Sequence, residues 1–241
     1  MFNIKKIKTM QFLAKNSIIF ILICGLYACT KEPTNTPVSV YCSAINEKLY
    51  SFSRLSDFEK NKFDELKKSR FLKYNNDIIE AAKTFEIEWE LLAAVAFQES
   101  QWNPKARSAT QVKGMMMLTL PTAASVGVTN RLAPIQSIYG GAQYISDLKS
   151  NTDYGTSSGD KIAFMLASYN LGTTNIKNAI NAIDKKPSEV TWLDLEGYLL
   201  NLKTSMDSEN YSRGQQTVDF VERVRDYYYL LLAQNCSDSQ I

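Results

Sequence analysis

The segment 89–100 constrains this chain most, because it predicts a helix whose apolar stripe ends in an acid. Glu99 lies on the same face as Leu92 and Val95, at the spacing of one side of a helix. A carboxyl group that continues an apolar stripe is partly desolvated, and desolvation raises its pKa. Such a group can act as a general acid near neutral pH. The alternative is a glutamate at a helix end whose side chain reaches water.

Composition limits the chemistry that this chain can perform. Hydrophobic residues make up 45% of the 241 residues and aromatic residues 11%, which is enough for a folded core. Because the chain has 0 histidines, Ser-His-Asp catalysis, Cys-His catalysis and His-ligated metals are excluded. No glycine-rich phosphate-binding loop is present. Catalysis would therefore depend on carboxylates, tyrosine, lysine or backbone dipoles, and we expect neither a cofactor nor a metal.

The first 28 residues have the pattern of a targeting segment. Lysines cluster in 5–15, and the mostly apolar run 18–26 is far shorter than the ~20 residues that span a bilayer. This pattern predicts a signal peptide. The following Leu-Tyr-Ala-Cys at 26–29 resembles a bacterial lipobox, which predicts cleavage before Cys29 and its acylation; several acyl chains hold a protein firmly at a membrane. The alternative is an ordinary signal peptide with an incidental cysteine.

Removal of 1–28 would change both the charge and the cysteine content. The whole chain has a formal charge of +2, and loss of a segment with four lysines and no acid leaves −2, so nothing predicts binding to nucleic acid. We expect a lipidated tether over 29–45 and a charged helical extension over 46–70. Cys42 and Cys236 would be the remaining thiols and are candidates for a disulfide in an oxidising compartment.

The rest of the chain predicts a mostly all-α fold with at most a very small β element around 110–118. Gly140-Gly141 is interpreted as a site of close backbone packing, with a turn as the alternative. The expected helices cover 78–84, 89–100, 122–126, a segment that reaches Leu148, 160–171, 174–183 and 217–233.

Four motifs occur in a characteristic order along the chain. They are Glu99-Ser100, Ser108, Gly114-Met115-Met116-Met117 and Ser168-Tyr169-Asn170. In these motifs the chain resembles the lytic transglycosylase (SLT) domains of the goose-type lysozyme-like superfamily, in particular the catalytic domain of the F-type membrane-bound lytic murein transglycosylases. The resemblance covers roughly 71–232. It implies a single lysozyme-like catalytic domain, which we expect over 71–235.

The resemblance also implies a reaction, a substrate and a location. The substrate would be the β-1,4 bond between N-acetylmuramic acid and N-acetylglucosamine in the glycan strands of peptidoglycan. Glu99 would act first as acid and then as base, and cleavage would leave a 1,6-anhydromuramoyl end. Together with the lipobox, this predicts an enzyme of the cell envelope that is lipid-anchored in the outer membrane and faces the periplasm.

Further site residues are carried over from the same motifs. The resemblance implies that Ser100 and Ser108 orient Glu99 or contact sugar, and that Tyr169 approaches Glu99. Asn170 would hold the local loop or sugar. The backbone of Gly114, Met115 and Met116 would line the substrate groove. The alternative roles are structural, since consecutive methionines often fill core gaps and a tyrosine at the end of an apolar stripe often belongs to the core.

The chain departs from the family pattern at two positions. Two alternative functions also stay open. Met117 stands in place of the usual Gln, and Phe220 in place of a Tyr; each change removes a polar group. A lysozyme-like hydrolase would need a second carboxylate. A non-catalytic peptidoglycan-binding lipoprotein would not need Glu99. The candidates for a second carboxylate are Asp147, Asp160 and Asp219.

Overall fold

The computed structural model describes residues 37–202 and 212–238. The expected signal peptide and the expected lipidation site, Cys29, therefore lie outside the described residues. The described α-helices are α2 (Pro37–Phe52), α3 (Asp57–Ser69), α4 (Asn75–Thr84), α5 (Trp89–Ser100), α6 (Leu120–Ser125), α7 (Pro134–Ser150), α8 (Ser158–Leu171), α9 (Thr173–Asn181), α10 (Trp192–Asn201) and α11 (Arg213–Asp238). Two short 3₁₀ helices, η1 (Phe71–Lys73) and η2 (Pro187–Glu189), complete the set.

The mostly all-α prediction is confirmed, and the β structure is as small as expected. Within the described ranges there is no strand, only isolated antiparallel bridges that join Lys113 to Arg107 and to Leu118. Helix α5 has the bounds that its apolar stripe predicted. Helix α10 had no sequence prediction, although Thr191 and Asp194 form a capping box at its start.

The N-terminal part of the described chain is more helical than expected. The chain divides into two compact units, residues 1–43 and 44–241, and only the start of α2 is described in the first unit. Residues 37–45 were expected in the tether but belong to α2. In the second unit, Ile45 packs with Leu232 and Ala233 of α11, and this apolar contact explains why the helix continues. No helix in the described residues is long and apolar enough to cross a membrane.

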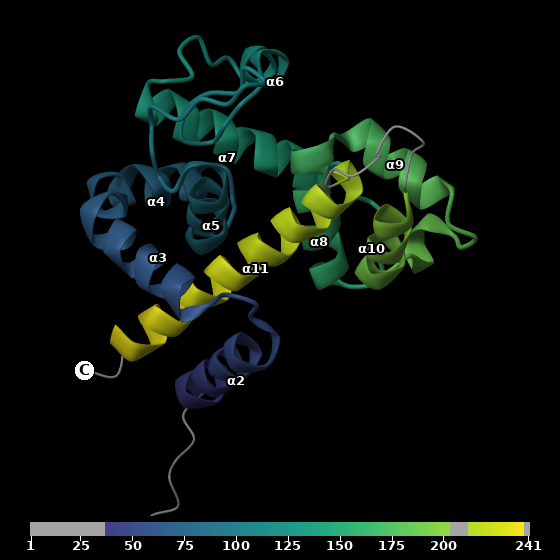
Figure 1. The fold of residues 1–241 in the computed structure, drawn as a ribbon, viewed down its shortest axis with the longest axis horizontal. Coiled ribbons are helices and arrows are strands. Elements are labelled where there is room, and N and C mark those ends of the chain that lie inside the picture. The colour runs from purple at the N-terminus through teal and green to yellow at the C-terminus, as the bar shows by residue number, and fades with distance from the viewer. Residues whose placement is uncertain (1–36, 203–211, 239–241) are drawn as a thin grey trace, which may run out of the picture. The chain divides into compact units, whose positions relative to one another are not determined.

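Helix α11 organises the core of the second unit. It runs beside α5, α8 and α10 (Figure 1), and the stripe of Val224 and Leu231 on α11 is fully buried. Helix α7 packs against both α4 and α8. As a result, the C-terminal end of α5 and the C-terminal half of α8 are held by a common set of packed helices. These two ends carry Glu99 and Tyr169.

Gly140 and Gly141 lie inside α7, so the structure supports the interpretation as a site of close packing and not the alternative of a turn. A Cβ on Gly140 would lie 2.3 Å from the Val128 side chain, and a Cβ on Gly141 would lie 2.5 Å from the Met116 side chain. Either substitution would force its neighbour to move, because real Cβ atoms essentially never approach so closely. The glycines therefore let α7 approach the segment that precedes it.

Candidate active site

Glu99 lies in the last turn of α5, and its environment disfavours a negative charge. Burial raises the pKa of its carboxyl group to about 8. The C-terminal end of a helix carries partial negative charge, so the backbone of α5 opposes ionisation as well. Glu99 keeps partial solvent access. A group of this kind is largely protonated at neutral pH and can donate a proton.

The chain turns sharply immediately after this helix. Gln101 and Trp102 both have a left-handed backbone, with φ of 52° and 55°. Such backbone conformations cost of order 1–3 kcal/mol each in non-glycine residues. Trp102 is fully buried, and its Nε1 donates to the backbone oxygen of Ala93 at 2.9 Å. Burial of this indole offsets the strain and fixes the turn beside Glu99.

The Ser100 hydroxyl ties this turn to the next motif. Its Oγ donates to the backbone oxygen of Met115 at 2.8 Å, and it accepts from the Asn103 backbone N–H at 3.1 Å. Ser100 thus fixes the position of the methionine segment relative to α5. Ser108 is bonded differently, because its Oγ lies 2.8 Å from the Thr110 hydroxyl within the same exposed loop. The structure therefore brings Ser100, but not Ser108, into the contacts that surround the end of α5.

Gly114 begins the methionine segment in a conformation that favours glycine. Its φ is +86°, and a Cβ there would lie 1.8 Å from the backbone oxygen of Arg131. Arg131 holds the same segment from outside, because its Nη1 donates to the backbone oxygens of Gln111 and Leu118, each at 2.8 Å. The turn is thereby fixed without a regular strand pair.

The side chains of the methionine segment mainly belong to the core. Met115 and Met116 are fully buried, and only Met117 is partly exposed. Of this segment only Met117 offers exposed surface to a groove, because Gly114, Met115 and Met116 are buried with their backbone. Met117 also has a left-handed backbone, with φ of 45°. Its partial exposure makes it the methionine of this run that can reach solvent.

Tyr169 connects α8 to the methionine segment and lies near Glu99. Its hydroxyl donates to the backbone oxygen of Met116 at 2.7 Å. Burial, followed by the charge of Glu99 and then that of Tyr144, raises the pKa of Tyr169 well above its ordinary value. The predicted approach of Tyr169 to Glu99 is consistent with this electrostatic coupling.

Helix α11 supports the two residues at the end of α8. Phe220 stacks on the Tyr169 ring with centroids 6.1 Å apart and planes 6° apart. The Thr217 hydroxyl lies 3.0 Å from Asn170 Oδ1. This contact is consistent with a local structural role for Asn170, which is one of the two roles expected for it. The replacement of Tyr by Phe at position 220 keeps the aromatic support of Tyr169.

Sequence reasoning missed the contribution of Ser137 on α7, although it did expect close packing at Gly141. Ser137 is fully buried, and its Oγ accepts a hydrogen bond from the Met116 backbone N–H at 3.1 Å. Gly141 follows one turn later and makes room for the Met116 side chain. A serine and a glycine at i and i+4 on the buried face of a helix could have indicated this close contact.

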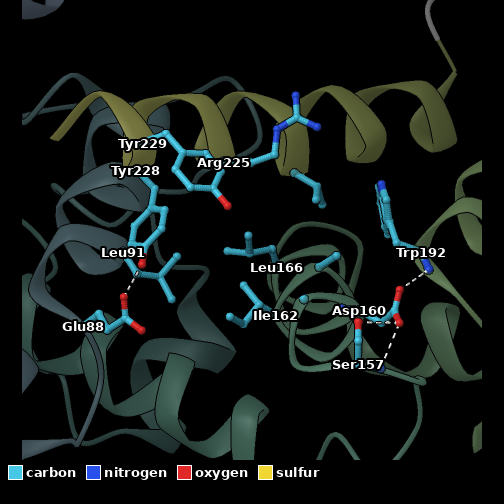
Figure 2. Close-up of a pocket in the computed structure, with 13 residues that line it drawn as sticks. Glu88, Leu91, Ser157, Asp160, Ile162, Leu166, Trp192, Arg225, Tyr228 and Tyr229 are labelled. Atoms are coloured by element: carbon cyan, nitrogen blue, oxygen red, sulfur yellow. Dashed lines mark hydrogen bonds between the residues drawn. The ribbon is translucent and has the colours of Figure 1, made fainter. Parts of the chain in front are cut away.

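A separate cavity of about 310 Å³ lies near the N-terminal ends of α5 and α8. The C-terminal ends of these two helices carry Glu99 and Tyr169. Figure 2 shows Leu91 and Tyr228 on one side of it, and Trp192 and Asp160 on the other. Its polar groups already have partners, because Tyr228 donates to the Glu88 carboxylate and Asp160 accepts from the Trp192 backbone N–H. None of the motif residues lines this cavity. We therefore place the candidate chemistry at Glu99.

The fold and the desolvated acid define a lysozyme-like class of protein. Residues 76–191 of this chain match the family described as transglycosylase SLT domain. The chain is similar to membrane-bound lytic murein transglycosylase F from two organisms. The relative in Shewanella loihica is 38% identical over 196 residues, covering 78% of this chain and 40% of the relative. The relative in Photobacterium profundum is 41% identical over 169 residues, covering 68% and 31%.

The fold is also similar to a solved structure. The 70 kDa soluble lytic transglycosylase from Escherichia coli matches with a TM-score of 0.52 and 19% identity. The match covers 84% of this chain and 31% of that chain. At this identity the likeness shows the fold alone. This chain spans less than half the length of either curated relative.

Proposed function

We propose that this protein is a peptidoglycan lytic transglycosylase in which Glu99 is the catalytic acid and base. The observation that carries the proposal is the carboxyl group of Glu99, whose pKa burial raises to about 8, at the end of α5 within an SLT domain. The names of the curated relatives support the substrate class. We place the cleaved bond between N-acetylmuramic acid and N-acetylglucosamine.

The proposed reaction uses the two protonation states of Glu99 in turn. Protonated Glu99 donates its proton to the bridging oxygen as the bond to C1 of the muramoyl residue breaks. The resulting carboxylate then accepts the proton of the C6 hydroxyl on the same residue. The C6 oxygen bonds to C1 and closes a 1,6-anhydro ring, so no water is consumed. Because the attacking hydroxyl is already tethered to the reacting sugar, much of its orientation entropy is lost beforehand.

The described residues give little support to a hydrolase that uses a second carboxylate. Asp160 caps α8 and is engaged by the Trp192 backbone N–H, and these hydrogen bonds outweigh burial and lower its pKa. Asp147 is exposed, and Asp219 accepts from the Gln215 side chain at 2.8 Å. Asp160 and Asp219 are therefore engaged in other contacts and Asp147 lies on the surface, whereas the transglycosylase reaction needs only Glu99.

The proposed substrate contacts come from the segments that surround Glu99. The Gly114–Met116 segment stays the proposed wall of the sugar groove, with the partly exposed Met117 at its end, and Ser100 and Tyr169 hold its backbone through their hydrogen bonds. Asn170 fixes the end of α8 through Thr217. Ser108 remains a proposed sugar contact in the partly exposed loop.

The substitution Glu99→Gln tests the proposed role directly. It removes the transferable proton and keeps the shape, so we expect a folded protein whose turnover of peptidoglycan falls by about 10²–10⁴-fold. Glu90→Gln is the matched control, because Glu90 lies on the same helix and burial also raises its pKa. It should retain turnover. Near-normal turnover by folded Glu99→Gln would refute the assignment and favour a role in binding alone.

Anchoring by Cys29 is a second part of the proposal. The relatives are named membrane-bound, and the basic segment, apolar run and Leu-Tyr-Ala-Cys sequence predict a lipid-anchored protein of the outer membrane facing the periplasm. The substitution Cys29→Ser should release the protein from the membrane fraction. If the variant sediments with membranes as the parent does, another anchor is responsible.

The disulfide between Cys42 and Cys236 is a third part of the proposal. Each side chain is mostly buried, at 3% and 7% exposure. A bond that closes so long a loop could stabilise the protein by at most about 5 kcal/mol. Non-reducing peptide mapping of the exported protein should recover the linked pair. Alkylation of both thiols without prior reduction would contradict it.

A further inference from the structure

The backbone of Met116 is held from two helices at once. Its N–H donates to Ser137 Oγ of α7 at 3.1 Å, and its oxygen accepts from the Tyr169 hydroxyl of α8 at 2.7 Å. Met116 and Ser137 are both fully buried. Loss of either hydrogen bond would therefore leave a backbone group without water to replace the partner, which is costly. Met116 thus transmits the position of α7 to the Tyr169 hydroxyl.

Helix α7 meets Met116 with two residues that lie one turn apart. Ser137 holds the backbone of Met116, and Gly141 leaves room for its side chain, since a Cβ on Gly141 would lie 2.5–2.8 Å from three Met116 side-chain atoms. Burying a hydroxyl costs free energy unless it is hydrogen-bonded. The bond to Met116 accounts for a serine at this fully buried position.

The bond from Tyr169 to Met116 decides what the tyrosine can offer Glu99. A phenolic hydroxyl has one proton and can otherwise only accept. Because that proton is directed to Met116, the Tyr169 oxygen presents lone pairs to other neighbours. A lone pair beside a carboxyl group favours its protonated form, whereas a donated proton would favour the carboxylate. The general acid must be protonated before the leaving group departs.

We propose that Ser137 is a positioning residue that, through Met116, keeps the Tyr169 proton directed away from Glu99 and so holds Glu99 in its acid form. This inference rests on the proposed role of Glu99. Ser137 does not contact the reacting atoms in this arrangement. It acts through one backbone residue and one tyrosine.

The other titratable groups near this arrangement are few. Tyr169 comes from α8, and Tyr144 of α7 lies beside it with ring centroids 5.4 Å apart. Helix α11 contributes Phe220, which does not titrate. Burial raises the pKa of Glu99, and no described side chain lowers it. If the Tyr169 hydroxyl directs its proton to Glu99 and no longer to Met116, the pH dependence of turnover should therefore change.

The test compares pH profiles of kcat and KM on purified glycan strands for the parent protein and for Ser137→Ala. Without the serine, Met116 is free to shift and Tyr169 can turn its proton toward Glu99. We expect the basic limb of the kcat profile to shift to lower pH by roughly half a pH unit to one pH unit, with KM nearly unchanged. Ser137→Thr keeps a hydroxyl, so its basic limb should lie at the same pH as that of the parent protein.

The matched control and a second variant separate positioning from folding. Thr152→Val removes another mostly buried hydroxyl, which donates to the Leu148 backbone oxygen just past the end of α7, and should leave the limb in place. Should Ser137→Ala not fold, Ser137→Cys keeps the side-chain volume but accepts hydrogen bonds weakly, and should give a smaller shift in the same direction.

Two outcomes distinguish failure of this inference from failure of the proposed function. If Glu99→Gln is inactive but folded Ser137→Ala, or Ser137→Cys in its place, keeps the parent limb, Ser137 has only a structural role and the inference is overturned. If Glu99→Gln is active, the assignment of Glu99 fails first, and the inference fails with it.

Discussion

The Tyr169 hydroxyl donates to the backbone oxygen of Met116 at 2.7 Å, and this bond joins residues 53 positions apart in the chain. It brings the last turn of α8 to the methionine segment, which Ser100 ties to the end of α5. Three motifs that are separate in the sequence therefore meet beside Glu99. The buried position of this contact makes it sensitive to small changes in the turn that begins at Gly114.

Gly114→Ala should destabilise the protein strongly. The new Cβ would combine a backbone φ of +86° with an approach of 1.8 Å to the Arg131 backbone oxygen. The matched control is Gly127→Ala, which has a φ of +71° and no atom within 4 Å of the new Cβ. We expect the control to cost about 1 kcal/mol and Gly114→Ala to cost at least about 2 kcal/mol more. Denaturant unfolding measures both, and equal losses would contradict the role of the close approach.

The stability of the parent protein relative to Glu99→Gln should depend on pH. Burial raises the pKa of Glu99 from 4.5 to about 8 in the folded state. Between these values the folded protein binds more protons than the unfolded chain, so the parent loses stability as pH rises. The advantage of Glu99→Gln should grow through this window by up to about 1.4 kcal/mol per pH unit, reduced by the partial solvent access of Glu99.

Unfolding free energies measured below, within and above this window check the prediction. The difference between the two proteins should be constant below pH 4.5 and constant again above pH 8. A difference that does not vary with pH would mean that Glu99 titrates normally in the folded protein.

Ser168→Ala should be neutral or stabilising. Ser168 is 1% exposed, and its hydroxyl has no hydrogen-bond partner among the described residues. Its removal relieves the cost of burying an unpaired polar group, so we expect the free energy of unfolding to stay the same or to rise by about 1 kcal/mol. Thermal or denaturant unfolding provides the measurement. A loss above about 1 kcal/mol would show that the hydroxyl makes a stabilising contact.

Asn170 and Thr217 should be energetically coupled. Their side-chain oxygens lie 3.0 Å apart, and Thr217 is fully buried. A double-mutant cycle with Asn170→Ala and Thr217→Val should give an interaction free energy of about 0.5–1.5 kcal/mol. Additive effects of the two substitutions would indicate that each residue stabilises its own helix independently.

The sequence predicted the parts of the site that lie on regular helices. The stripe through Leu92 and Val95 located α5 and placed Glu99 on its buried face, because helical periodicity is a local property. The burial of Glu99 and the shift of its pKa were predicted for the same reason, and the structure confirms both. The short β element near 110–118 was also expected and consists only of bridges.

The remaining features depend on contacts between distant segments. The serine and glycine spacing on α7 indicates a close contact, but it does not identify Met116 as the partner of Ser137, since that contact requires α7 to pack against the methionine segment. The helical state of residues 37–45 depends likewise on burial of Ile45 against α11. The sequence motif suggested that Ser108 could orient Glu99, but its hydroxyl bonds within its own loop. Periodicity cannot predict such pairings.

The mass of the muropeptides released from purified peptidoglycan tests the central claim most directly. A transglycosylase leaves 1,6-anhydromuramoyl ends, which are lighter by one water than the reducing ends left by a hydrolase. We predict anhydro ends with the parent protein and with Glu90→Gln, and about 10²–10⁴-fold less product from Glu99→Gln. Products with reducing ends would contradict the account, because they would require water in place of the C6 hydroxyl as the nucleophile.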